Sequence, residues 1–345
     1  MLSVVRLIVI LTMFSCVGTV APRGLHTAKL FPAFRQNNSD VNRAGYIDGN
    51  GRVVIDFRFY SAGNFSEGLA PVTLKRDEKT GYIDQTGRVV IEPNFEAAHR
   101  FVEGVAAVKI DNRWGYIDPS GKQLVNPRFD FAMDFSGGLA PVLLHGQWGF
   151  INKTGEWRIN AAFDRANAFS EGLACVLADD RAGYINRKGK WIIEPRFEKM
   201  NSLGDQQMLA SFKEGLAVFK LENRYGFINK KGEVVIASQF ERAEGFSEGL
   251  AAVTVGSLKG FIDQGGNIVI APRFESASSF SEGLAAVKLE GKWGYVDRTG
   301  TMVIPPQFDS VLGFKDGLAQ VWIWDGDAGY IDKSGKFVWR AKWRL

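Results

Sequence analysis

One four-residue element recurs along almost the whole chain and constrains its fold more than any other feature. It reads Gly, Tyr or Phe, Ile or Val, then Asp or Asn, and it begins at Gly45, Gly81, Gly115, Gly149, Gly183, Gly226, Gly260, Gly294 and Gly329. Successive copies start 36, 34, 34, 34, 43, 34, 34 and 35 residues apart. A fixed period in this range is typical of stacked or radial arrays of small units. We therefore predict one repeat array, although 345 residues would otherwise suggest about two domains.

Each copy carries the same turn signal after the element. The Asp or Asn is followed three residues later by Gly, as in Asp84 and Gly87. Asp or Asn opening a type I turn, with Gly in the left-handed position, is typical of a three-residue hairpin loop. Short β-branched runs such as Val89–Ile91 follow at once, and Pro93 or an equivalent Pro ends most of them. The element and this run are therefore two antiparallel strands.

A third strand precedes each element and completes the unit. It reads Gly-Leu-Ala-x-Val in most copies, and a short polar turn such as Glu290–Lys292 joins it to the element. Because this strand is apolar at successive positions, we expect both of its faces to be buried. Phe pairs six residues apart, such as Phe95 and Phe101, recur in the connectors and are expected to fill the space between neighbouring sheets.

These observations predict an all-β fold built as a tandem array of three-stranded antiparallel meanders of about 34 residues. Small sheets that are buried on both faces must stack on their neighbours. We favour an open, curved or superhelical, solenoid-like array. The alternative is a closed ring like a β-propeller, but nine blades would exceed the usual four to eight.

The chain before the array contains a targeting signal. Residues 1–21 combine Arg6 with an apolar run and small residues, as in a secretory signal peptide. Three outcomes fit this leader: lipidation of Cys16 as in a bacterial lipoprotein, plain cleavage, or an uncleaved anchor. Residues 22–44 are expected to form a linker and an amino-terminal cap. Residues 45–345 hold nine repeats, with an insertion at 199–211.

Composition restricts the classes of partner. The net charge is +4, and charges of both signs are interspersed, so no polyanion-binding field and no nucleic-acid partner are expected. Contact with a membrane is expected only through the leader or a lipid on Cys16. Cys175 is the other cysteine and occupies a repeat position held elsewhere by Ala or Pro, which indicates a small buried residue.

Three copies carry Trp immediately before the element, and their surroundings identify a family. Trp114-Gly115, Trp148-Gly149 and Trp293-Gly294, each within the full unit, resemble the signature of the WG repeat family. The Trp is replaced in the remaining copies by Ala44, Thr80, Ala182, Tyr225, Lys259 and Ala328. The resemblance implies a bacterial, often envelope-associated, β-repeat protein, and it carries over no catalytic residue.

The residues that could carry chemistry favour structural interpretations. Asp48 to Gly51 has some likeness to a calcium loop but lacks its later ligands, and the same offset recurs as turn chemistry. A carboxylate recurs at one repeat position, as in Glu103. Such a repeated carboxylate is more readily explained by a recurring hydrogen bond to a turn or a neighbouring unit than by a catalytic pair, which needs two carboxylates in different environments. His26, His99 and His145 are scattered. We therefore expect no enzyme activity, no metal site and no cofactor.

The remaining candidates for a ligand site are aromatic. Trp322 and Trp324 lie two residues apart near the end of the array and are expected to form an exposed patch on one strand. We expect a non-catalytic scaffold of the bacterial envelope or exterior that binds a protein partner through its repeat surface. The alternative is a carbohydrate or cell-wall binding module that uses exposed aromatic residues. The predicted location is periplasmic, outer-membrane-anchored or extracellular.

Overall fold

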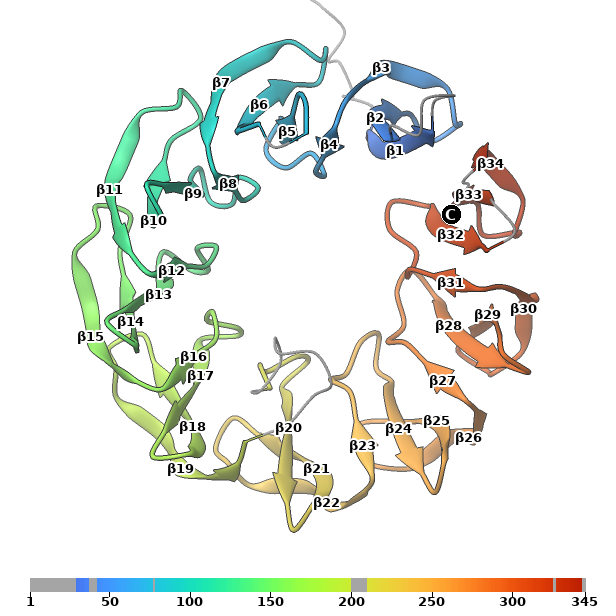
Figure 1. Ribbon diagram of the computed structural model, residues 1–345. Coiled ribbons are helices and arrows are strands. Elements are labelled where there is room, and N and C mark those ends of the chain that lie inside the picture. The colour runs from blue at the N-terminus through green and yellow to red at the C-terminus, as the bar shows by residue number, and fades with distance from the viewer. Residues whose placement is uncertain (1–28, 37–41, 77, 200–209, 325–326, 343–345) are drawn as a thin grey trace, which may run out of the picture.

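The sheets stand side by side around a central opening (Figure 1). A computed structural model describes residues 29–36, 42–76, 78–199, 210–324 and 327–342. These residues form nine small antiparallel sheets and no helix. The molecule is a nine-bladed β-propeller, and the blades are numbered one to nine in chain order.

The first four blades run from the amino-terminal side of the ring. Blade one comprises β1 (Phe31–Gln36), β2 (Asn42–Ile47) and β3 (Val53–Phe59). Blade two comprises β4 (Ser61–Ala62), β5 (Leu69–Thr73), β6 (Thr80–Asp84) and β7 (Val89–Phe95). Blade three comprises β8 (Ala97–Ala98), β9 (Ala106–Ile110), β10 (Arg113–Ile117) and β11 (Gln123–Phe129). Blade four comprises β12 (Phe131–Ala132), β13 (Ala140–Leu144), β14 (Gln147–Ile151) and β15 (Trp157–Phe163).

The remaining five blades continue the same order. Blade five comprises β16 (Arg165–Ala166), β17 (Leu173–Ala178), β18 (Arg181–Asn186) and β19 (Trp191–Glu198). Blade six comprises β20 (Leu216–Leu221), β21 (Arg224–Asn229) and β22 (Val234–Phe240). Blade seven comprises β23 (Arg242–Ala243), β24 (Ala251–Val255), β25 (Leu258–Ile262) and β26 (Ile268–Phe274). Blade eight comprises β27 (Ser276–Ala277), β28 (Leu284–Leu289), β29 (Lys292–Asp297) and β30 (Met302–Phe308). Blade nine comprises β31 (Ser310–Val311), β32 (Ala319–Ile323), β33 (Asp327–Ile331) and β34 (Phe337–Lys342).

Within a blade the strands follow one another from the centre outward (Figure 1). The predicted antiparallel meander is confirmed: in blade three, Ala107 of β9 pairs with Tyr116 of β10, which pairs with Val125 of β11. The prediction of three strands per unit missed the two-residue inner strand, such as β8. A strand of two residues is too short to show an alternation of apolar and polar side chains, so it carried no strand signal.

The signature glycine is required by a close approach of two backbones. Opposite Gly115 the register of β10 and β11 shifts, so the outer strand bulges across the glycine. A Cβ at Gly115 would lie 2.4 Å from the carbonyl oxygen of Val125. Gly149 and Gly294 meet the outer strand of their own blades equally closely. The glycine therefore permits the bulge within the outer strand, which runs on to Phe129 in blade three.

The core lies between blades, as the recurring phenylalanines predicted. Tyr116 of blade three packs against Phe135 of blade four with ring centroids 4.9 Å apart, and its buried hydroxyl donates to the carbonyl of Met133 at 2.7 Å. Phe150 of blade four packs in the same way on Phe169 of blade five. Each blade therefore buries its signature aromatic against the next blade, and no blade has a complete core of its own.

Contacts between blades nine and one close the ring. Phe31 lies against Tyr330 with ring centroids 5.6 Å apart, and the Tyr330 hydroxyl donates to the carbonyl of Pro32 at 2.9 Å. Phe57 stacks on Trp339. The prediction of an open, curved or superhelical array was therefore wrong, and the closed propeller given as the alternative is the fold.

The shape of the blades explains the closure. The inner edge of a blade is a two-residue strand that carries small side chains, as in β8, whereas the outer strand is seven residues long, as in β11. Wedge-shaped units of this kind turn steadily about one axis, and nine of them bring the last blade beside the first (Figure 1). The usual range of four to eight blades was a poor guide because it says nothing about wedge angle.

The structure can be compared with only part of the expected segments. The segment 22–44, expected to be a linker and cap, supplies all of β1 and the start of β2, so a piece of it is blade one. Most of the insertion at 199–211 lies outside the described residues, as does the leader 1–21 with Cys16.

Candidate functional site

The two faces of the ring differ in the turns they carry. The turn Ser136–Leu139 and the turn Asn152–Gly155 lie at one end of the blade-four strands, and the turn between Leu144 and Gln147 lies at the other end. Because every blade is built alike, we call the first end the glutamate face, after the x-Glu-Gly turns that it carries. The hairpins that follow the two-residue strands form the inner rim of the ring (Figure 1).

The repeated carboxylates on the glutamate face link each blade to the next. Glu103 of blade three accepts hydrogen bonds from the backbone N–H groups of Gly137 and Gly138, the latter at 2.9 Å. In five other junctions a glycine N–H of the following blade donates in the same way to a glutamate of the preceding blade. The donor and acceptor pairs are Gly104 and Glu67, Gly215 and Glu171, Gly249 and Glu214, Gly283 and Glu248, and Gly317 and Glu282. Asp316 pairs with Lys29 of blade one. The interpretation of these residues as recurring hydrogen-bond acceptors is confirmed.

A polar cluster on the inner strands of blades three and four was not predicted as a site. His99 Nδ1 lies 3.1 Å from Asp134 Oδ1, and Arg100 Nε donates to Asp134 Oδ2 at 3.3 Å. The His99 ring packs on buried Trp114, with centroids 4.9 Å apart, and Trp114 packs on half-exposed Phe131. Basic and acidic side chains from two adjacent blades therefore meet beside an aromatic surface.

The groups around Asp134 lower the pKa of its carboxyl. Partial burial works to raise the pKa of this carboxyl, but the hydrogen bonds and charges of His99 and Arg100 outweigh it and hold the pKa below its ordinary value. The carboxylate is therefore ionised at neutral pH and holds the imidazole in place. Sequence reasoning missed the pair because His99 and Asp134 are 35 residues apart, although that spacing is one repeat and brings equivalent positions side by side.

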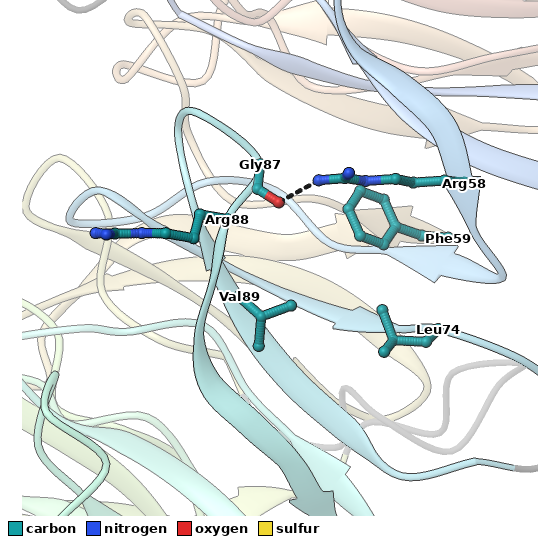
Figure 2. A pocket seen from close by; sticks show the side chains of 6 residues that line it. All are labelled: Arg58, Phe59, Leu74, Gly87, Arg88 and Val89. Carbon is teal, nitrogen blue, oxygen red and sulfur yellow. Dashed lines mark hydrogen bonds between the residues drawn. The ribbon is translucent and has the colours of Figure 1, made fainter.

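A pocket opens on the flank between blades one and two (Figure 2). Its volume is about 370 Å³, and it is lined by Arg58, Phe59, Leu74, Gly87, Arg88 and Val89. The Arg58 guanidinium lies 5.2 Å from the centroid of the Phe59 ring and donates a hydrogen bond to the carbonyl of Gly87. One wall of the pocket is therefore a link between the two blades.

A residue smaller than tryptophan begins the outer strand of blade two, beside the pocket. Trp157 and Trp191 begin the outer strands of blades four and five and pack edge-on against Phe129 and Phe163 of the preceding blades, at 5.8 Å in both cases. Val89 occupies the equivalent position and leaves the space over Phe59 unfilled. The pocket is a gap in the repeat packing, and its lining offers few convergent polar groups for a specific ligand.

The tryptophans singled out from the sequence fall into two environments. Trp114 and Trp148 are buried between blades, and Trp293 is half-buried, as expected for signature positions. Trp322 is half-buried within β32, whereas Trp324 lies beyond the end of that strand and is 67% exposed. The two therefore do not form one exposed strand face, and of the two only Trp324 presents most of its indole to solvent.

Exposed aliphatic side chains begin the outer strands of most blades, and the most exposed of them, Val234 and Ile268, lie on the adjacent blades six and seven. Val234 and Val235 begin β22, Ile268 and Val269 begin β26, and Val303 lies at the start of β30. They are 40–58% exposed. We call these five residues the outer patch.

Cys175 shows the properties expected of a small core residue. Its thiol is buried, and burial raises its pKa to about 12. The described residues hold no group of three or more His, Cys, Asp or Glu that could bind a metal ion. Within the same residues no helix is long and apolar enough to span a bilayer.

Comparison with solved structures finds similar arrangements at low sequence identity. BamB from Moraxella catarrhalis is 11% identical, with 82% of this chain and 88% of that chain covered at a TM-score of 0.43. Hsv2p from Kluyveromyces lactis is 11% identical, with 67% and 89% covered at 0.41. An inactive virginiamycin B lyase from Staphylococcus aureus, solved with quinupristin, is 13% identical, with 70% and 94% covered at 0.36. Comparison with curated protein sequences gives no match.

The sequence itself matches one family model repeatedly. The model described as the WG containing repeat matches residues 45–75, 81–114, 114–148, 148–181, 183–225, 225–258, 260–293 and 293–321. These matches cover most of the chain, and each one starts within one blade and ends within the next, as 81–114 runs from β6 to β10. The chain therefore belongs to the family of proteins built from the WG containing repeat.

Proposed function

We propose that this propeller is a non-catalytic scaffold of the bacterial envelope or exterior that binds a protein partner through its repeat surface. The observation that supports it is the outer patch. Large apolar side chains exposed on a soluble protein can mark an interaction site. Val234 and Ile268 are each more than half exposed and lie at equivalent positions on adjacent blades.

The outer strands of blades six to eight carry few charged residues, as does β11 of blade three, whose one charged residue is Arg128. Asp56 in β3, Glu92 in β7, Arg158 in β15 and Glu194 in β19 place a charged side chain among the outer-strand residues. The strands β22 and β30 carry no charged residue. In β26 the one charged residue, Arg273, stacks on Phe274 and donates to the carbonyl of Gly300 at 2.6 Å. Charges protect exposed strand edges against pairing, and the strands that carry the patch lack this protection.

An affinity capture with matched variants tests the proposal. Tagged protein is used to capture partners from a solubilised envelope fraction, and the captured proteins and glycans are measured in parallel by mass spectrometry. We expect one dominant protein with the wild type and its loss in the double variant Val235→Lys, Val269→Lys. Each introduced ammonium group would have to be desolvated at the interface, which is unfavourable.

The control is Val54→Lys on blade one. Val54 occupies the same repeat position and is 43% exposed, close to the 44% of Val235 and Val269. This variant should capture as much partner as the wild type. Capture that survives the double lysine variant, or that Val54→Lys abolishes equally, would remove the outer patch from the proposal.

A carbohydrate-binding function is the second candidate, and the exposure of Trp324 supports it. An indole that is 67% exposed can stack on the apolar face of a sugar ring. Its backbone N–H donates to Asp309 at 2.9 Å, which fixes the turn that presents it. Polysaccharide captured by the wild type and lost in Trp324→Ala, with the outer patch intact, would favour this function over the first.

Export is part of the proposal and has a separate test. Metabolic labelling with palmitate in a bacterial host, followed by fractionation, should show a lipid-labelled, envelope-associated product that is absent in Cys16→Ser. Unlabelled, shortened protein in the periplasm or medium would support plain cleavage of the leader. Full-length protein in the cytoplasm would contradict export.

A further inference from the structure

The blade junctions on the glutamate face share one set of donors and one acceptor. The donors are the backbone N–H of the turn glycine in the following blade and, in several junctions, a polar side chain after the Asp or Asn of its second turn. Thus Glu171 accepts from Gly215 N–H at 3.0 Å and pairs with Lys230 at 2.9 Å. Lys153 approaches Glu103, and Lys333 approaches Glu282. Each preceding blade supplies the carboxylate that these donors bind.

The junction between blades four and five has the donors without the carboxylate. Blade four carries Gly137 where the other described turns of this kind carry Glu or Asp. In the following blade, Gly172 N–H has no hydrogen-bond partner within the described residues. Arg187 holds the position of Lys153 and Lys230. No ion pair or hydrogen bond joins its guanidinium to the described chain, and it is exposed.

Arg187 lies over the place where the missing side chain would begin. A Cβ built on Gly137 would come within 2.2 Å of Arg187 Nη2. The guanidinium therefore sits beside the vacant acceptor position. Lys188 and Lys190 lie in the same turn and are also exposed, so the local charge is positive. An unpaired backbone donor next to an unpaired guanidinium is the donor set that a carboxylate accepts most strongly.

We propose that Gly172 N–H and Arg187 form a binding site for a glutamate side chain supplied by a protein partner. We call this site the carboxylate socket. The inference rests on the proposed protein-binding function but not on the outer patch, because the socket lies at the junction of blades four and five and the outer patch lies on blades six to eight. A glutamate fits because the repeat itself fills the equivalent site with glutamate in Glu103, Glu171 and the other copies. In those copies the glutamate stands on a two-residue turn at positive φ, so the ligand is a glutamate presented on an exposed turn.

Glycine amide resonances of the full-length protein test the socket directly. The protein is labelled with ¹⁵N-glycine and ¹³C′-glutamate, so that the Gly172 amide is identified among the Glu-Gly pairs by its change in Glu171→Asp. Titration with the peptide N-acetyl-Ser-Glu-Gly-amide should move the Gly172 proton resonance downfield to a plateau. The matched peptide N-acetyl-Ser-Gln-Gly-amide should leave it in place.

Variants of the socket give the second arm. Gly137→Glu restores the internal carboxylate, because six other turns hold Glu at φ of 51–55° and the flexible Arg187 side chain can swing aside. It should move Gly172 downfield without peptide and abolish the response to peptide. Arg187→Gln should weaken peptide binding about tenfold, the usual effect of losing one charge-assisted hydrogen bond. Lys188→Gln, which removes the same charge one residue away, should change it by less than about twofold.

Three results would overturn the inference. They are a Gly172 resonance that does not respond to the glutamate peptide, an equal response to the glutamine peptide, and a response that persists in Gly137→Glu. A peptide with a free terminal carboxylate and no glutamate, N-acetyl-Ser-Gly-Gly, should not move the resonance. If it does so as strongly, the site binds a chain terminus and the assignment to glutamate is wrong. Because no partner is needed, failure of the capture experiment leaves this test intact.

Discussion

The junction between blades three and four and the junction between blades four and five share one repeat plan but differ in their polar links. At the first junction Glu103 binds Gly137 and Gly138, and the Tyr116 hydroxyl donates to the carbonyl of Met133. Arg128 stacks on Phe129 and donates to the carbonyl of Gly155 at 2.5 Å. Three variable polar positions are therefore occupied by residues that reach across, whereas Val102 stands where the equivalent turns carry Ser or Lys.

At the second junction each of these three residues is replaced by one that cannot reach across. Gly137 takes the place of Glu103, Phe150 the place of Tyr116, and Ala162 the place of Arg128. The Ser136 hydroxyl, in place of which the first junction has Val102, donates to the carbonyl of Phe169 at 2.6 Å, and Trp191 packs on Phe163. The junction is therefore held chiefly by apolar contact.

The difference shows that apolar contact is the constant part of a junction and polar links are the variable part. Phe135 and Phe169 are both buried and stand 4.9 Å from the aromatic of the preceding blade. A junction can lose its polar links and keep this geometry. The second junction is then free to present Gly172 and Arg187 to a partner.

The largest expected effect comes from removing the constant part. Phe169→Ala and Phe135→Ala should each destabilise the protein by about 3–5 kcal/mol, the usual cost of emptying a buried aromatic site. Hydrogen exchange measured by mass spectrometry should separate them. Blades four and five should exchange faster in Phe169→Ala than blades three and four do in Phe135→Ala, where polar links remain. Equal acceleration would show that the polar links contribute nothing to holding the junction.

Exchanging Tyr and Phe between the junctions should have a smaller effect. Tyr116→Phe leaves the buried carbonyl of Met133 without its donor and should cost about 1–2 kcal/mol in urea denaturation. Phe150→Tyr places a hydroxyl near the carbonyl of Asn167, which holds the position of Met133, and should stabilise by about 0.5–1 kcal/mol. A destabilising Phe150→Tyr would mean that the second junction is packed too closely to accept the hydroxyl.

The arginine exchange is expected to be weaker again, because the guanidinium is partly exposed. Arg128→Ala should cost about 1 kcal/mol through the lost stacking on Phe129 and the lost hydrogen bond to Gly155. Ala162→Arg should gain a fraction of that amount by stacking on Phe163 and reaching the carbonyl of Gly189. Thermal unfolding of the two variants beside the wild type measures both changes. If Arg128→Ala has no effect, the recurring Arg-Phe contact is not a stabilising feature of the repeat.

The sequence was sufficient for what repeats locally. The period, the strand order, the Asp-Gly turns and the burial of Phe135 and Phe169 all follow from patterns within one unit or its neighbour. Closure could not be predicted in this way, because it depends on a small rotation at each junction that accumulates over nine blades. The contacts that finally close the ring, such as Phe31 with Tyr330, join residues about 300 positions apart.

The candidate sites were harder to predict for a different reason. Gly137 was visible as an exception in the row of carboxylates, but its meaning depends on the unpaired donors Gly172 N–H and Arg187, which only the fold brings beside it. Trp324 was expected to share a strand face with Trp322, and the early end of β32 at Ile323 separates them. The pairing of His99 with Asp134 had a signal in the spacing of one repeat. Reading that signal requires knowing that inner strands of adjacent blades are side by side.

The smallest expected effect is on the pH dependence of the first junction. The pKa of Asp134 is held low in the folded state, so its carboxylate stabilises the fold above the unfolded pKa of about 3.9. That contribution is lost as the pH falls through the lower, folded value. The wild type should therefore exceed Asp134→Asn in stability by less than about 1 kcal/mol at pH 7, and the difference should shrink below about pH 4.

Asp164→Asn at the second junction is the matched control for this measurement. The Asp164 side chain is exposed and has no hydrogen bond or ion pair within the described residues. Its replacement should change stability little, and by a similar amount at every pH between 3 and 7. Denaturation at several pH values compares the two variants. A pH-dependent difference in Asp164→Asn as large as that in Asp134→Asn would mean that the contrast reflects net charge. The contacts of Asp134 with His99 and Arg100 would then not be its cause, and the two junctions would differ less in their electrostatics than their geometry indicates.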